Sequence, residues 1–556
     1  MILALALLLA SADPAAAFAS LDRAKVPEEE ARARIASAVR SLEDLSMPRT
    51  ATVMLGAFAS DRDQPEGVRT AAREALAARA PADPALVELL ISGQADPGKL
   101  PAPLALAIAR GRLERALQIA PLEEGSAFEP LATESADPAP TPVAAHPLDK
   151  DLAAEMGQAA PEATPAPAPQ PQQRLAGEAQ RELDAARALA ASVAPGDPLA
   201  GEAKEVSGLA ALAAGDVPAA TREFMAVVDL PVRKGDQAAA ARRDKAWLQL
   251  ARLAYQNGDD ALASRLYQRV GRGAPEWLDA LFEASWAHFR RGEDEKALGN
   301  LLTLHAPFFQ ERFFPESFVL KALVLYENCR YPDARKALAE FQQRYEPLHD
   351  ALAEVLRQLP APQAASDLMA RGPAGVQQAV PAAAREEVAR LEQAPDLRAA
   401  MAAAAQLASE IDSIDRRPEP FRDSVLVRRM APLARKARSD LLETAGRRLI
   451  ARLGAERATL RELVGQSLRL SYEIAGREKE LASAPPSSGP AVRAHADPPH
   501  VADDEELWPF QGEYWRDELG SYQYQLGQRC RRPRTPLPTA QQLPAPAPKI
   551  AEVPGG

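Results

Sequence analysis

The chain has 556 residues, of which 50 are proline and only 5% are aromatic. Because proline and small residues bury little surface, much of a chain with this composition lies outside a packed core. The formal net charge is −11 at pH 7. This acidic balance argues against nucleic acid as the main partner, because phosphate binding requires a basic surface.

The first residues resemble an export signal. Residues 2–10 form an unbroken apolar run that is too short to span a bilayer, and Ala17-Phe18-Ala19 follows as a cleavage site. We therefore expect a signal peptide over residues 1–19, a periplasmic or envelope-associated location, and no transmembrane segment in the mature chain. No Lys or Arg precedes the apolar run, so an uncleaved anchor or a misassigned start codon is the alternative.

Residues 20–120 are predicted to form a small helical module. Within them, residues 30–42, 68–78 and 103–119 place apolar side chains at helical spacing, with Asp-Pro and Pro-Gly turns between them. Residues 121–175 are rich in Pro and Ala and hold few large apolar side chains. Since such a segment lacks both backbone donors and surface to bury, we expect it to be a disordered linker.

Residues 176–350 contain an internal repeat. Gly258, Ala263 and Tyr267 are followed 34 positions later by a Gly, an Ala and a Leu, which keeps a turn residue, a small residue and a large packing residue in register. The same positions recur in one unit upstream and one unit downstream. The equivalent positions of the four units are Gly215, Ala220 and Phe224; Gly258, Ala263 and Tyr267; Gly292, Ala297 and Leu301; and Cys329, Ala334 and Leu338.

These spacings resemble those of the tetratricopeptide-repeat family, with two clear units and two degenerate ones. Trp247 and Leu250 begin the first helix of one unit, and the small residue Ala263 lets the two helices of that unit approach closely. The resemblance implies an all-α solenoid of stacked antiparallel helix pairs, with a concave groove that binds proteins or peptides.

Polar residues on the first helices of the units are candidates for lining that groove. Charge reversal at Arg252 and Arg291 together is then expected to weaken partner capture without unfolding the chain. For each single residue, simple exposure to solvent is the alternative. The candidates are Gln249, Arg252, Asn257, Glu283, His288, Arg291, Lys321 and Asn328, with Trp247 and Leu250 holding the shape of the groove.

Residues 351–482 are predicted to form long helices. One apolar stripe covers residues 397–411 and a second covers residues 449–481, both with spacings of three, four and seven. A Pro-Glu-Pro sequence at 418–420 separates the two stripes. We therefore expect a helical hairpin within one chain, with a dimeric coiled coil as the alternative. Two polar residues interrupt the second stripe, namely Glu456 and Ser467.

The densest aromatic segment covers residues 504–530. It lies between a second loose stretch, residues 483–503, and a Pro-rich tail, residues 531–556, that we expect to be disordered. Because aromatic rings bury large areas, we expect the segment to dock, either on the chain's own helices or on a partner. The expected docking side chains are Trp508, Phe510, Tyr514 and Trp515.

The chain has two cysteines, Cys329 and Cys530. In an oxidising compartment they are candidates for a disulfide that pins the aromatic segment against the last repeat. Two unrelated cysteines are the alternative, because a disulfide requires the two Cα atoms to lie within about 7 Å.

The sequence carries no recognisable catalytic motif. The six histidines are scattered, and the chain has no Walker loop, no dinucleotide-binding glycine motif and no G-x-S-x-G sequence. We therefore expect no enzymatic activity, no metal, no cofactor and no small-molecule substrate.

The order of these features is similar to that of periplasmic tetratricopeptide proteins of deltaproteobacteria and myxobacteria, some of which belong to gliding-motility or envelope assemblies. The likeness rests on the export signal, the repeats, the hairpin and the sequence GEYWRDELG at residues 512–520. It implies an exported scaffold or adaptor for other envelope proteins, in a motility or secretion complex. An outer-membrane protein assembly factor is one alternative, and a cell-wall enzyme with a repeat-built accessory domain is another.

Overall fold

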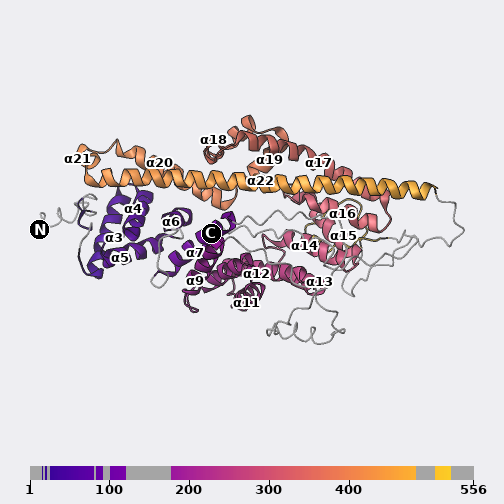
Figure 1. Cartoon of the computed structure of the whole chain (residues 1–556), viewed down its shortest axis with the longest axis horizontal. Helices are drawn as coiled ribbons and strands as arrows, with labels where there is room; N and C mark the ends of the chain where they lie inside the picture. The colour runs from indigo at the N-terminus through magenta and orange to yellow at the C-terminus, as the bar shows by residue number, and fades with distance from the viewer. Residues whose placement is uncertain are drawn as a thin grey trace.

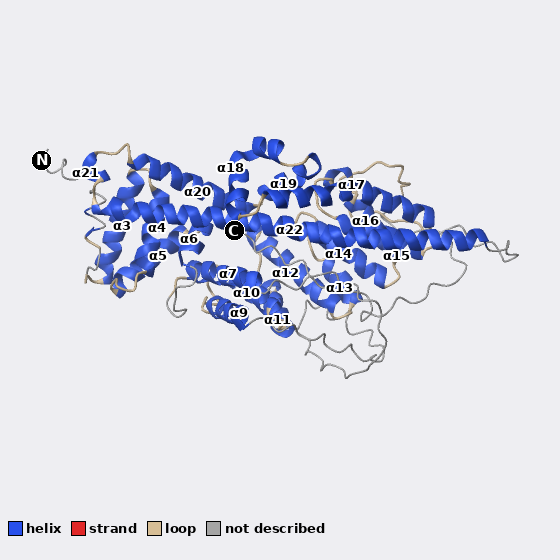
Figure 2. Ribbon diagram, turned by 45° about the horizontal axis from the view of Figure 1, so that its top comes forward, coloured by secondary structure: helices blue, strands red, loops and turns tan. Residues whose placement is uncertain are grey.

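The computed structural model describes residues 16, 19–21, 25–80, 83–91, 100–119, 177–483 and 508–526. Every regular element within these residues is a helix, which confirms the predicted all-α solenoid class. Figure 2 shows helices joined by loops and turns throughout this part of the chain. None of the helices in the described ranges has both the length and the apolar character needed to cross a bilayer.

Several predicted segments lie outside the described residues. They are the signal peptide apart from Ala16 and Ala19, the linker of residues 121–175, the stretch of residues 483–503 apart from Ser483, the tail of residues 531–556, and Cys530.

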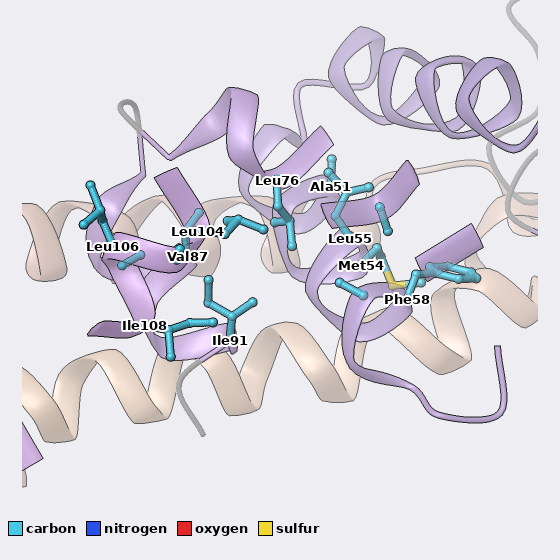
Figure 3. Packing of buried hydrophobic residues seen from close by; sticks show 14 of the residues in the cluster. Ala51, Met54, Leu55, Phe58, Leu76, Val87, Ile91, Leu104, Leu106 and Ile108 are labelled. Atoms are coloured by element: carbon cyan, nitrogen blue, oxygen red, sulfur yellow. The ribbon is translucent and has the colours of Figure 1, made fainter. Parts of the chain in front are cut away.

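The N-terminal helices pack around a common apolar core. Figure 3 shows Leu55 of one helix near Leu76 of the next, with Leu104 and Ile108 from a later helix in the same core, to which Phe58 also belongs. These side chains recur at helical spacing because each helix buries one face. The helices are α3 (Glu28–Asp44), α4 (Pro48–Ser60), α5 (Glu66–Arg79), α6 (Pro84–Ile91) and α7 (Ala102–Ile119).

The following helices form the stacked pairs that the repeat predicts. The pairs α10–α11, α12–α13, α14–α15 and α16–α17 each consist of two consecutive helices packed together, and each pair contacts the next. The helices are α9 (Gly177–Ala191), α10 (Ala200–Ala213), α11 (Val217–Val228), α12 (Gln237–Gln256), α13 (Asp260–Tyr267), α14 (Trp277–Arg290), α15 (Asp294–Leu304), α16 (Pro315–Glu327) and α17 (Tyr331–Gln358), with a 3-10 turn η2 (Pro307–Phe309) before α16.

The four pairs share one turn geometry. Each turn contains a residue with positive φ, where glycine is favoured because it has no Cβ. The N–H of the residue that follows donates to the carbonyl five residues back, in the pattern of a Schellman turn. The positive-φ residues are Gly215 (74°), Gly258 (80°), Gly292 (75°) and Cys329 (56°), and the hydrogen bonds are Asp216 to Ala211 (2.9 Å), Asp259 to Ala254 (3.0 Å), Glu293 to His288 (2.9 Å) and Arg330 to Leu325 (2.9 Å).

The small residue predicted at each helix contact is fully buried. The four alanines at this position, Ala220, Ala263, Ala297 and Ala334, are each 0% exposed. The large residues four positions later are also buried. The register predicted from the sequence is therefore confirmed in all four units.

The structure contains a further helix pair whose two helices the sequence analysis assigned to different domains. Helices α7 and α9 pack together, and their residues share one core with α3–α6 and α10. Ala186 of α9 is fully buried and precedes the start of α10 by as many residues as Ala263 precedes the start of α14. The predicted module of residues 20–120 is therefore continuous in packing with the solenoid, rather than separated from it.

The last helix extends along the whole molecule. Helix α22 (Val425–Ser483) has 59 residues, which corresponds to a length of roughly 90 Å. Figure 1 shows it running from the N-terminal helices to the last pairs of the solenoid. Before it come α18 (Pro362–Ala379), η3 (Ala382–Ala384), α19 (Arg385–Glu392), α20 (Pro395–Ile414) and α21 (Glu419–Arg422).

Helices α20 and α22 form the predicted hairpin. They pack against each other, and the break between them contains Pro418 and Pro420. The stripe of α22 continues well beyond the hairpin, since Leu449, Leu460 and Ile474 are buried. The two polar residues within the predicted stripe, Ser467 and Glu456, also lie in the interior, with the Glu456 side chain only 13% exposed.

The close approach of the paired helices can be tested at Ala263. We expect Ala263→Leu to lower the free energy of unfolding by about 1–3 kcal/mol, because the larger side chain overpacks the contact. Thermal unfolding followed by circular dichroism measures this change. Ala339→Leu is the matched control, because Ala339 lies in α17 and is exposed. Equal melting temperatures for the two variants would show that the contact at Ala263 is wrongly placed.

Candidate protein-binding surfaces

Two of the predicted groove residues form a buried ion pair between units. Arg252 of α12 donates to Glu283 of α14 through two nitrogens, at 2.9 and 2.7 Å. The two side chains are 12% and 10% exposed, and the hydroxyl of Tyr267 donates to the same carboxylate at 3.2 Å. Burial would lower the pKa of Arg252, but the Glu283 carboxylate outweighs it and the pKa is raised.

This pair belongs to a series of ion pairs that links successive first helices of the units. Basic and acidic side chains alternate along the first helices from α7 through α10 and α12 to α14, so these four units are joined by opposite charges. Burial raises the pKa of Glu205, a member of the series. The pairs are Arg110 with Glu202, Arg242 with Glu202 (3.9 Å), Arg242 with Glu205 (3.5 Å), Lys245 with Glu276 (4.0 Å) and Arg252 with Glu283 (2.7 Å).

Most of the other groove candidates also contact the chain itself. Gln249 is 4% exposed and His288 is 5% exposed. His288 Nδ1 lies 2.6 Å from Glu293, and burial lowers the pKa of His288. Asn328 donates to Asp294 at 2.8 Å, and Lys321 lies 3.5 Å from Glu340. The two candidates that are exposed are Asn257 and Arg291.

The predicted groove therefore needs correction. Gln249, Arg252, Glu283 and His288 are buried between helices rather than lining an open surface. Arg252 and Glu283 are buried because their two helices approach closely enough for the opposite charges to pair, and His288 because it contacts Glu293 at the turn of its own unit. Trp247, half-buried, and Leu250, buried, lie in or beside the core of these units as the sequence predicted.

The aromatic segment docks on the chain itself, against α15. The N–H of Gly520 donates to Thr303 Oγ1 at 2.9 Å, and the N–H of Leu526 donates to Glu295 Oε1 at 2.8 Å. Arg272, in the loop before α14, donates to the carbonyl oxygens of Asp517, at 3.0 Å, and Leu519. The segment is thus held through its main chain.

The side chains expected to anchor this segment are not its anchors. Trp508 is 70% exposed, Trp515 is 55% exposed and Phe510 is 43% exposed. The buried side chains are Leu519 and Leu526, at 7% and 9% exposed. The two tryptophans therefore do not dock on the chain's own helices, because the short stretch that contacts α15 begins after them. Their docking on a partner, the alternative, stays a prediction. The other expected anchor, Tyr514, stacks edge-on against Phe510 and Tyr522.

Arg516, which follows Trp515 in the segment, contacts a fourth exposed ring. Phe308, in η2, is 44% exposed, and the guanidinium of Arg516 lies 5.1 Å from the centre of its ring. We call Trp508, Phe510, Trp515 and Phe308 the aromatic patch. A hollow of about 420 Å³ beside it is lined by Pro307, Phe308, Gln310, Glu311, Arg344 and Glu386.

Cys329 is disulfide-bonded. It occupies the turn position that is glycine in the three preceding units, with φ of 56°. Its predicted partner, Cys530, lies outside the described residues. The pairing of the two cysteines stays a prediction.

A second buried charge cluster lies between α19 and α22. Arg390 pairs with both Glu387 and Glu456. Burial, with a smaller effect of the Glu387 carboxylate, raises the pKa of Glu456 to about 9, although Arg390 opposes the shift. Among the described residues, no group of three or more His, Cys, Asp or Glu side chains is arranged to hold a metal ion.

Comparisons with known proteins add little to this description. No protein-family model matches the chain, and no curated protein matches it. Among solved structures, a protein described as a circular tandem repeat protein with novel repeat topology and enhanced subunit contact surfaces matches at 15% identity. The match covers 81% of this chain and 91% of that protein, with a TM-score of 0.14. A likeness this weak supports no argument about function.

The ion pair between α12 and α14 can be tested by charge reversal. We expect Arg252→Glu to lower the free energy of unfolding by about 3–5 kcal/mol, because it leaves Glu283 buried beside a like charge. Arg291→Glu removes only the solvent-exposed ion pair of Arg291 with Glu293, at 3.1 Å, and should change it by no more than about 1 kcal/mol. Chemical denaturation measures both. The double variant Arg252→Glu, Glu283→Arg should recover part of the lost free energy of unfolding. An equal loss of this free energy in Arg252→Glu and Arg291→Glu would contradict the pairing.

The raised pKa of Glu456 predicts a pH-dependent stability. The folded chain keeps this proton between the ordinary carboxyl pKa of about 4.5 and about 9, whereas the unfolded chain loses it. Glu456 therefore costs stability as the pH rises through this window. We therefore compare the free energy of unfolding of Glu456→Gln with that of the parent at two pH values. We expect this difference to favour the variant by at least about 1 kcal/mol more at pH 8.5 than at pH 5. The control is Glu473→Gln, at an exposed position of the same helix, and a gain independent of pH would contradict the prediction.

Proposed function

We propose that the protein is an exported, non-enzymatic scaffold of the tetratricopeptide type that binds other proteins of the cell envelope. The observation that supports this proposal most directly is the aromatic patch. It comprises three exposed rings of the docked segment and the exposed ring of Phe308, over which Arg516 of the same segment lies. Large exposed aromatic groups mark interaction sites, and Trp, Tyr and Arg dominate the binding energy of protein interfaces.

The repeat architecture is a second support. The stacked pairs are closed by a shared turn with one small buried residue at each helix contact, which is the arrangement that the tetratricopeptide resemblance implies. Stacked pairs of this kind expose long surfaces, which proteins use for binding other proteins. Because the polar positions of α12 and α14 pair internally, we place the binding function on the aromatic patch instead.

Export and an envelope location are part of the proposal. Their support is the apolar run at residues 2–10 and the Ala-Phe-Ala site that follows. Leu21, two residues after the expected cleavage point, is fully buried in the first core, so cleavage after Ala19 would leave this core intact. Membership of a gliding-motility or secretion complex rests on the narrower resemblance to periplasmic tetratricopeptide proteins.

The proposal is tested by removing the aromatic patch. We expect the triple variant Phe308→Ala, Trp508→Ala, Trp515→Ala to capture at least about tenfold less partner from periplasmic extract than the parent, since each hot-spot ring contributes 2 kcal/mol or more. Quantitative mass spectrometry of the captured proteins measures the change. Tyr472→Ala is the matched control, because Tyr472 is an 84% exposed aromatic residue on α22.

Two results would contradict the proposal. One is that the triple variant, melting like the parent, captures the same proteins in the same amounts. The other is that the Tyr472→Ala control loses them to the same extent, which would mean that the capture does not depend on the patch.

A further inference from the structure

Residues 517–526, which we call the strap, lie antiparallel along one face of α15. Gly520 is opposite Thr303, Tyr522 is opposite Gly299, and Leu526 is opposite Glu295. The three helix positions are four residues apart, so they lie on the same face of α15. From Ser521 to Leu526 the strap has no helix or strand of its own.

This face binds the main chain of the strap. Thr303 Oγ1 accepts the N–H of Gly520 at 2.9 Å, and Glu295 Oε1 accepts the N–H of Leu526 at 2.8 Å. Arg272 donates to two carbonyl oxygens at the start of the strap. Main-chain groups are present in every peptide, so these contacts suit an extended segment largely regardless of its sequence.

Two glycines set the fit between the strap and this face. A Cβ at Gly299 of α15 would collide with the carbonyl oxygen of Tyr522. A Cβ at Gly520 would lie 2.9 Å from Trp277, and Gly520 has φ of 90°, which side chains other than glycine rarely adopt. Gly299 of α15 therefore leaves room for the main chain of the bound segment, and Trp277 leaves room for only a glycine at the position of Gly520.

Two leucines provide the apolar part of the recognition. Leu519 and Leu526 are the buried side chains of the strap, and Leu526 joins the core formed by α14–α17 and the end of α22. The glycine requirement falls directly after the first leucine. The face therefore favours a segment that has a Leu-Gly pair and a second Leu six residues after the glycine.

We propose that this face of α15 is a peptide-binding site that the strap fills in cis. The site, defined by Arg272, Trp277, Glu295, Gly299 and Thr303, takes an extended segment of a partner protein with the same Leu-Gly and Leu spacing when the strap is displaced. The inference rests on the proposed function, since it names a second surface of the scaffold and the chemistry of the segment that it binds. A tethered strap competes at high effective concentration, which keeps the site closed to weak ligands.

The experiment measures binding of a fluorescent peptide with the sequence of residues 517–528 to the full chain. In the variant Gly520→Val the strap no longer fits against Trp277, so the site becomes available to the added peptide. We expect the peptide to bind this variant at least about tenfold more tightly than it binds the parent chain, measured by fluorescence anisotropy. A peptide with Ala in place of Gly520 and Ser in place of Leu526 should not bind.

A second substitution locates the bound peptide. Gly299→Ala places a methyl group where the carbonyl of Tyr522 lies, although alanine is the better helix former. We expect the double variant Gly299→Ala, Gly520→Val to lose peptide binding. The matched control combines Gly520→Val with Gly454→Ala, because a Cβ at Gly454, also within a helix, meets no atom within 4 Å. This control should bind like Gly520→Val alone.

Hydrogen exchange of the full chain gives a readout that does not depend on Gly520→Val. In Gly299→Ala alone, the amide hydrogens of Gly520 and Leu526 should exchange at least about tenfold faster than in Gly454→Ala. The inference is overturned if they exchange at the same rate. It is also overturned if the peptide fails to bind a folded Gly520→Val chain, or binds it equally well with and without Gly299→Ala. Partner capture that still depends on the aromatic patch would show that the proposed function survives such a failure.

Discussion

The apolar stripe of α22 is the interaction on which the rest of the structure depends. Met430 lies in the core of the N-terminal helices, Leu449 in the core of α17–α20, and Ile474 in the core of α14–α17. A helix of this length gains its stability from such packing, because helical propensity alone contributes little. Charged residues reinforce the same contacts, since Arg448 donates to Glu114 of α7 at 2.7 Å and Arg452 pairs with Asp396 of α20 at 3.1 Å. The helix thereby fixes the two ends of the solenoid relative to each other.

The packing between units explains why the binding surfaces that we propose do not include the first helices of the units. Consecutive first helices approach closely, and their opposite charges pair, as Arg252 and Glu283 do. Buried ion pairs require both partners, so these positions are committed to joining the units. The two surfaces that we propose for recognition are the exposed aromatic patch and the face of α15 that the strap covers. The strap side of this pair lies near the end of α22, since Leu526 shares a core with Leu470 and Ile474.

One turn geometry recurs beyond the region of the repeat. Ser46, between α3 and α4, has φ of 60°, and the N–H of Met47 donates to the carbonyl of Leu42 at 2.9 Å. This is the pattern seen at Gly258 in the solenoid. A serine and a cysteine take the place of glycine at two of these five turns, with φ of 60° and 56°. The N-terminal helices and the solenoid therefore share this turn geometry as well as a common core.

The sequence by itself determined the helical class, the register of the repeats at Gly258 and Ala263, and the hairpin break at residues 418–420. These features are local, because a turn needs a residue that tolerates positive φ and a close helix contact needs a small one. Only the tertiary structure decided that Arg252 is buried against Glu283, that α7 pairs with α9, and that Leu519 rather than Trp508 anchors the C-terminal segment. Each of these outcomes depends on which surfaces meet in the folded chain. The sequence shows that a residue is charged or apolar, but it does not show which distant residue it will contact.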